Sequence, residues 1–189
     1  TGLQMSMITL GGMVLQSVLN GFGVVFVAGY TAANKLYGIL ESASVAFGYA
    51  MTAYMGQNRG ARNAARIDAG IRAVLALSAG FTAAIVTAML VAGKPLLGLF
   101  LSTEEAGAAD ALAVAYQYLM ALMAFLFALF VLQAYRSSLQ GLGEMTVPTL
   151  SGFAEMLMRI GAALVLPTFI GQSGVFFAEG AAWVCAAAL

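Results

Sequence analysis

The stretch LAVAYQYLMALMAFLFALFVLQA, residues 112–134, runs for 23 residues without a charged side chain. An α-helix rises about 1.5 Å per residue, so a helix of this length can cross a hydrocarbon core about 30 Å thick. The residues next to it on both sides are far more polar. The stretch therefore predicts a transmembrane helix.

The rest of the chain has the same character. Its 189 residues are 62% hydrophobic and only 8% charged, and the mean hydropathy is +0.94. Because soluble domains carry about 25% charged residues, a soluble fold is excluded. We expect an all-α membrane protein, a bundle of six transmembrane helices, because the strands of a barrel would be only about 10 residues long. The six predicted segments are Gln4–Tyr30, Leu36–Gln57, Ile71–Ala92, Leu112–Ala134, Thr146–Phe169 and Gly174–Leu189.

The composition also limits the chemistry that the chain can perform. It has no His and one Cys, Cys185, so it can build neither a His/Cys metal cluster nor a Ser-His-Asp triad. A single Cys also excludes a disulfide scaffold. The formal net charge is zero, which is unlike a nucleic-acid binder. We therefore expect a protein that is not an enzyme, with no metal site, no cofactor and no nucleic-acid partner.

The polar connections predict the orientation of the segments. The two connections on one side carry five arginines: Arg59, Arg62, Arg66, Arg72 and Arg136. The other side has Lys35 and Lys94, and residues 93–110 there suggest a short amphipathic piece at the interface. The positive-inside rule places the Arg-rich side in the cytoplasm. We expect a multi-pass plasma-membrane protein, in the inner membrane of a bacterium, with both visible chain ends cytoplasmic and membrane lipid head groups against the arginines of residues 59–72.

Polar side chains at membrane depth face protein or a wet cavity, because hydrocarbon does not solvate them. Gln16 and Asn20 share a stripe of the first segment; they could line a substrate cavity or hydrogen-bond a neighbouring helix. Tyr37 and Glu41 share a stripe of the second segment. We expect Glu41 one or two turns from the outer surface, either binding a proton or a cationic substrate, or satisfied by Lys35 or outer water.

Two further acidic residues are paired at helical spacing. Glu155 and Arg159 are four residues apart, so they share a helix face. Removing one partner of a buried pair costs about 3–5 kcal/mol, which favours a structural or gating role over substrate binding. Glu179 and Trp183 have the same spacing, and we expect Glu179 near the outer surface. The aromatic and Met side chains of residues 112–134 are interpreted as packing and lipid-facing groups rather than as a site for lipophilic cations.

Seven short motifs, in their order and spacing, carry a family resemblance. They are GGMVLQSVLNGFG (11–23), AGYTAANK (28–35), YMGQNRGA (54–61), RIDAGIR (66–72), RSSLQGLG (136–143), EMLMR (155–159) and AEGAAW (178–183). Across essentially the whole chain they resemble the multidrug and toxic compound extrusion (MATE) family of secondary transporters. The sequence departs from the family pattern at Gly180, where Pro is expected after Glu179.

The resemblance implies twelve spans in two six-helix lobes related by pseudo-two-fold symmetry. We expect residues 1–189 to be one domain, the C-terminal lobe, truncated within its last helix, because residue 1 is Thr and the last segment is short. Its partner would be the missing N-terminal lobe. The family exchanges Na⁺ or H⁺ for cationic or amphipathic compounds through a cavity between the lobes. We expect Gln16, Asn20, Tyr37 and Glu41 to face that cavity.

Three alternatives to an antiporter lobe remain open. A flippase-type exporter of lipid-linked oligosaccharides would need a strongly basic cavity, whereas only Arg159 lies clearly inside a predicted span. A membrane scaffold would show no counter-transport. An intramembrane enzyme would need paired carboxylates on facing helices, for which Glu41 and Glu155 are the candidates.

Overall fold

The computed structural model describes residues 2–101 and 107–188; Glu104 and Glu105 of the predicted interfacial piece lie outside them. The described residues are helical and contain no strand, which confirms the all-α prediction. The elements are α1 (Gly2–Leu19), η1 (Asn20–Phe22), α2 (Val24–Gly60), α3 (Ala64–Gly98), α4 (Ala108–Gly141), α5 (Thr146–Ile170), η2 (Gly171–Phe177) and α6 (Ala178–Ala187).

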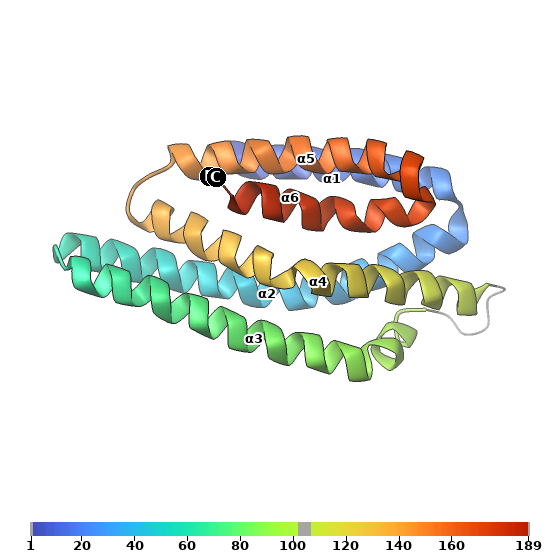
Figure 1. Ribbon diagram of the computed structural model, residues 1–189, viewed down its shortest axis with the longest axis horizontal. Helices are drawn as coiled ribbons and strands as arrows, with labels where there is room; N and C mark the ends of the chain where they lie inside the picture. Colours follow the sequence, from blue (N-terminus) through green and yellow to red (C-terminus); the bar gives the residue numbers. More distant parts are fainter. Residues whose placement is uncertain (1, 102–106, 189) are drawn as a thin grey trace.

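The helices run back and forth along the long axis of the molecule (Figure 1). One group contains α1, α5 and α6; the other contains α2, α3 and α4. The longest helix contact is between α2 and α4, and α4 also packs against α3 and α6, so it joins the two groups. Both chain ends lie toward the end of the bundle that carries the α2–α3 and α4–α5 connections.

Helix α4 contains the uncharged stretch 112–134 and forms the centre of the core. Tyr118, Leu119, Leu122, Leu126 and Phe130 are all fully buried. They belong to one hydrophobic cluster that reaches from α1 to α6. The packing interpretation of this aromatic segment is therefore confirmed for these residues.

The boundary between the first two predicted segments is wrong. Helix α1 ends at Leu19, η1 follows, and Gly23 breaks the helix with φ +91°. This is a conformation that glycine adopts without steric cost. Helix α2 then begins at Val24, so Asn34 and Lys35 lie inside it rather than at its start. The apolar residues on both sides of Gly23 conceal this turn in the hydropathy pattern.

Helix α2 is much longer than the segment predicted for it. Its 37 residues extend about 55 Å, and Glu41 is its eighteenth residue. Glu41 therefore lies near the middle of this helix, and its expected place one or two turns from the outer surface stays a prediction. Helix α3 likewise continues past Ala92 to Gly98, through Pro95.

Small residues let α2 and α4 approach closely. A Cβ added to Gly48 would lie 2.6 Å from Ser137 Oγ, and one added to Gly141 would lie 2.5 Å from the Thr52 carbonyl oxygen. The Thr52 hydroxyl also donates to the Ser137 carbonyl at 3.1 Å. Close backbone approach through small residues is a common way for helices to associate in a membrane.

Four helical stretches of the described chain are long and apolar enough to cross a membrane: Gly2–Phe22, Ala64–Gly98, Ala108–Gly141 and Thr146–Ala187. The last contains two of the six predicted segments, because α5 and α6 are continuous through η2 although the chain reverses there. Helix α2 is not among the four. The six predicted segments thus correspond to these four stretches and α2.

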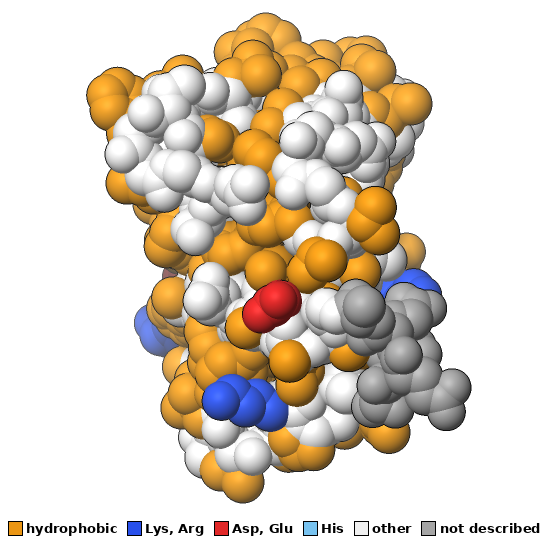
Figure 2. Space-filling view, turned by 90° about the vertical axis from the view of Figure 1, so that its right-hand side faces the viewer, with side chains coloured by type: hydrophobic (Ala, Val, Ile, Leu, Met, Phe, Trp, Pro, Cys, Tyr) orange, Lys and Arg blue, Asp and Glu red, His pale blue; other side chains and the backbone are white. Residues whose placement is uncertain are grey.

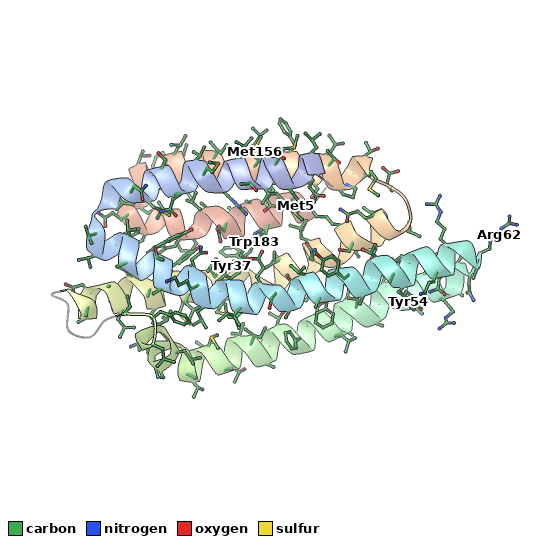
Figure 3. All side chains as sticks on the ribbon, turned by 180° about the vertical axis from the view of Figure 1, so that it is seen from behind. Met5, Tyr37, Tyr54, Arg62, Met156 and Trp183 are labelled. Atoms are coloured by element: carbon green, nitrogen blue, oxygen red, sulfur yellow. The ribbon has the colours of Figure 1, made fainter. Side chains whose placement is uncertain are left out.

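Large apolar side chains such as Leu10, Val91 and Phe169 are exposed on the outside of the bundle. Figure 2 shows the end opposite the α2–α3 turn, where hydrophobic and uncharged surface predominates. The other end carries Arg62, labelled at the tip of the α2–α3 turn in Figure 3. The two ends of the bundle therefore differ in charge.

At the Arg-rich end, side chains accept hydrogen bonds from N–H groups at the starts of α3 and α5. Asn63 accepts a hydrogen bond from the Arg66 N–H at 3.1 Å. Glu144 accepts one from the Thr146 N–H at 2.7 Å, and this bond lowers the pKa of the exposed Glu144 carboxyl below its usual value. Such hydrogen bonds satisfy the free N–H groups at a helix start.

Candidate functional site

A cavity of about 810 Å³ lies between α1, α2, α4, α5 and α6. It contains five charged residues: Glu41, Arg136, Glu155, Arg159 and Glu179. Figure 3 shows Met5, Tyr37 and Trp183 in the space between the α1–α5–α6 group and α2. Charged, aromatic and thioether side chains thus line one space at the middle of the lobe.

The structure brings most of the predicted cavity residues together. Gln16, Tyr37 and Glu41 line the cavity. Asn20 lies in η1 and is not among the lining residues, but its side-chain oxygen accepts a hydrogen bond from Gln16 at 3.1 Å. Tyr37 is buried and stacks on Trp183 with ring centroids 5.7 Å apart. Asn20 thus contacts the lining residue Gln16 without lining the cavity itself.

Glu41 differs from Glu155, another carboxylate of the cavity, in its partners. Between residues 2 and 101 and between 107 and 188, it forms no ion pair, including none with Lys35. Lys35 itself is exposed. The geometry therefore gives no support to a Glu41 carboxylate neutralised by Lys35.

Glu155 forms two buried ion pairs. Arg159 Nη2 lies 2.8 Å from Glu155 Oε1, which is the i, i+4 pair expected within one helix. Arg136 Nη1 lies 2.7 Å from Glu155 Oε2. Arg136 was expected in a surface connection, and that expectation is wrong: it is buried within α4, 6% exposed. Its position near the end of an apolar segment resembles a loop in the sequence, and nothing in the sequence pairs α4 with α5 there.

The Glu155 cluster connects three helices. Arg136 donates through Nε and Nη2 to Ser151 Oγ, at 3.0 and 2.8 Å. Ser151 in turn donates to the Ala186 carbonyl at 2.8 Å. The network therefore joins α4, α5 and the end of α6. Because two guanidinium groups share one carboxylate, the formal charge of the network is +1.

Glu179 was expected near the outer surface, and the structure shows that it is a buried residue of the cavity wall. It is 8% exposed and lines the cavity. Tyr118 donates to Glu179 Oε2 at 3.1 Å, and the Tyr118 and Tyr30 hydroxyl oxygens are 3.3 Å apart. The spacing of Glu179 and Trp183 was the available signal, since both residues face the cavity one turn apart.

Gly180 explains how α6 reaches this position. A Cβ at residue 180 would overlap the ring of Phe125 on α4, so the side-chain-free position lets α6 lie against α4. The departure from the expected Pro is therefore accommodated by packing. In this packing arrangement Glu179 lies next to Tyr118.

The arrangement favours the binding of a cation. With all groups ionised, the three carboxylates and two guanidinium groups of the cavity sum to a formal charge of −1. No group of three His, Cys, Asp or Glu able to hold a metal ion occurs among the residues that the structure describes. The site is suited to electrostatic binding of a small or organic cation in a low-dielectric space.

The MatE family model matches residues 1–165. This chain belongs to the MatE family. The resemblance seen in the sequence motifs is thereby confirmed. The chain is a helical, multi-pass membrane protein of a transporter family.

Named relatives agree with this assignment. This MatE chain is 31% identical over 195 residues to the "Probable multidrug resistance protein YpnP" of Bacillus subtilis (strain 168), covering all of this chain and 42% of YpnP. It is also similar in fold to the outward-facing conformation of a multidrug resistance MATE family transporter (TM-score 0.88, 20% identity, 98% of this chain and 41% of that one). A crystal structure of MATE in the bent conformation gives a TM-score of 0.86 at 19% identity, with 97% and 40% covered. The chain thus spans about two fifths of the length of these proteins, as one lobe would.

Proposed function

We propose that this chain is one lobe of a cation-coupled antiporter that exports cationic or amphipathic compounds in exchange for Na⁺ or H⁺. The observation that carries the proposal is Glu41, a mid-helix carboxylate that lines the cavity without an ion-pair partner among the described residues. An unpaired charge at membrane depth is costly. A substrate cation or a coupling cation supplies the missing positive charge.

The other lining residues fit varied lipophilic cations. A volume of about 810 Å³ is within the range of small-molecule sites. Met5 and Met13 offer polarizable thioethers, and Tyr37 and Trp183 offer aromatic faces. Such groups attract cations and adapt to different shapes. The protein would move these compounds without changing them chemically.

The remaining charges have supporting roles in this proposal. The cluster of Arg136, Glu155 and Arg159 holds α4, α5 and α6 together. The Arg-rich end, with Arg59 and Arg62, faces the cytoplasm and anionic lipid. The second lobe lies N-terminal to this one in the chain and completes the cavity. The two lobes move relative to each other and open the cavity to one side of the membrane at a time.

The test is drug export by the complete transporter with Glu41→Gln, which keeps the side-chain size and removes the charge. We expect loss of export for cationic drugs, while Asp68→Asn, at an exposed position of α3, keeps wild-type export. Unchanged, cation-dependent export by Glu41→Gln would remove this residue from the proposed mechanism.

A second candidate is a flippase-type exporter of anionic, lipid-linked substrates. Arg136 favours it, because the structure adds a second guanidinium group to the cavity. Both guanidinium groups are nevertheless bound to Glu155. Competition assays separate the candidates: cationic compounds should displace one another, and displacement by anionic lipid alone would support the flippase. A scaffold would transport neither.

A further inference from the structure

We infer that Glu179 is a proton-binding site of this lobe, held by Tyr118 and facing the cavity that contains Glu41. This inference rests on the proposed antiport. Glu41 then receives the positive charge of the substrate, and Glu179 receives the proton that is exchanged for it. The two roles fall on different helices, α2 and α6.

The hydrogen bonds around Glu179 suit both of its protonation states. A hydroxyl has one hydrogen to donate and lone pairs that accept. When Glu179 is ionised, Tyr118 donates to it over 3.1 Å and accepts from Tyr30 over 3.3 Å. When Glu179 is protonated, it donates to Tyr118, which donates in turn to Tyr30. Both states are therefore satisfied without a movement of the backbone.

Among the described residues no basic side chain forms an ion pair with Glu179, although the Arg159 guanidinium is close enough to act on it electrostatically. The titratable and charged groups that face it are Tyr118 on α4, Tyr30, Tyr37 and Glu41 on α2, and Glu155 and Arg159 on α5. Helix α1 and segment η2 contain no charged or titratable residue. The guanidinium groups of Arg136 and Arg159 both donate to Glu155. Among residues 2–101 and 107–188, Glu179 forms no ion pair with either of them. Glu179 can thus change its charge without breaking an ion pair.

The formal charge of the cavity couples the proton to the substrate. It is −1 with all five charged residues ionised. A proton that moves from cavity water onto the Glu179 carboxylate raises the formal charge of the cavity to zero. A monovalent cationic substrate at Glu41 does the same. Both together would give +1 in a low-dielectric space, which is unfavourable. Proton and substrate therefore exclude each other, which is the condition for exchange, and the proton returns to water when substrate binds.

The test uses the complete, purified transporter and a signal that does not depend on transport. Infrared difference spectra recorded across a pH titration detect the carbonyl stretch of a protonated carboxyl group. We expect a titrating band that is present in the wild type, lost in Glu179→Gln and kept in Glu41→Gln. In Tyr118→Phe, which keeps the ring and removes the hydroxyl, the band should remain with a shifted frequency. Its midpoint should move to higher pH, because hydrogen bonds to a charged acceptor are the stronger ones.

A second measurement counts protons released when a cationic drug binds. We expect one fewer proton released per drug in Glu179→Gln, whereas Glu41→Gln weakens drug binding and leaves the infrared band of Glu179 in place. An unchanged titrating band in Glu179→Gln would overturn the inference. So would a band that responds to Na⁺ at constant pH and not to pH. If the wild type shows the Glu179 band but transports no drug, the result would instead count against the proposed antiport alone.

Discussion

Replacing Glu155 with Gln should destabilise this lobe more than replacing either of the arginines bound to it. Glu155 binds Arg136 through one oxygen and Arg159 through the other, at 2.7 and 2.8 Å. Glu155→Gln therefore leaves two buried guanidinium groups without their ion-pair partner. Breaking a buried pair in this way costs about 3–5 kcal/mol, a large part of a typical stability of about 5–15 kcal/mol.

Arg159→Gln has a smaller expected cost. Glu155 keeps its bond to Arg136, and Arg136 keeps both bonds to Ser151. The loss is then about the value of one hydrogen bond between charged groups, about 1.5–3 kcal/mol. For a unit of this size, each kcal/mol lowers Tm by about 2–4 °C. We thus expect a fall of roughly 6–20 °C for Glu155→Gln and roughly 3–12 °C for Arg159→Gln.

The assay is thermal unfolding of the complete transporter in detergent, followed by the amount that remains monodisperse after heating. Asp68→Asn, on the exposed face of α3, should stay within about 0.5 kcal/mol of the wild type and serves as the control. A Glu155→Gln variant that is as stable as Arg159→Gln would refute the shared-carboxylate arrangement.

Three other predictions concern packing, binding and orientation. Gly180→Ala should cost about 1–3 kcal/mol in the same melting assay, because its Cβ overlaps Phe125; Phe125→Leu should restore part of this loss, and no restoration would argue against the contact. Tyr37→Ala should raise the Kd of a cationic drug about 2- to 10-fold, because the stack on Trp183 is lost, whereas Tyr37→Phe should bind nearly as the wild type does. Arg62→Cys should react with an impermeant maleimide only from the cytoplasmic face; labelling from the outside would reverse the proposed orientation.

The fold class and most helix interiors could be predicted, because long uncharged stretches have few alternatives to a membrane helix. The end of α1 could not be predicted. The turn at Gly23 lies between apolar residues, and hydropathy does not detect a change of chain direction. The length of α2 was missed for a related reason, since Asn34 and Lys35 look like residues outside a membrane.

The candidate site was only partly predictable. Gln16, Tyr37 and Glu41 share helix faces with other polar residues, and spacing within one helix is visible in a sequence. Arg136 was misplaced because its partner Glu155 belongs to another helix, 19 residues away. The hydrogen bond of Glu179 was missed for the same reason: the Tyr118 hydroxyl that binds it comes from α4, 61 residues earlier. Contacts between helices depend on packing, which no single-sequence pattern specifies.

The most direct test of the proposed antiport is cation-driven counter-transport by the complete transporter in proteoliposomes. A gradient of H⁺ or Na⁺ is imposed, and movement of a fluorescent cationic drug against its own gradient is recorded for the wild type and Glu41→Gln. We expect drug movement in the wild type that requires the cation gradient and is lost in Glu41→Gln. Wild-type vesicles that move no drug under either gradient, while the protein remains folded and binds drug, would contradict the proposal.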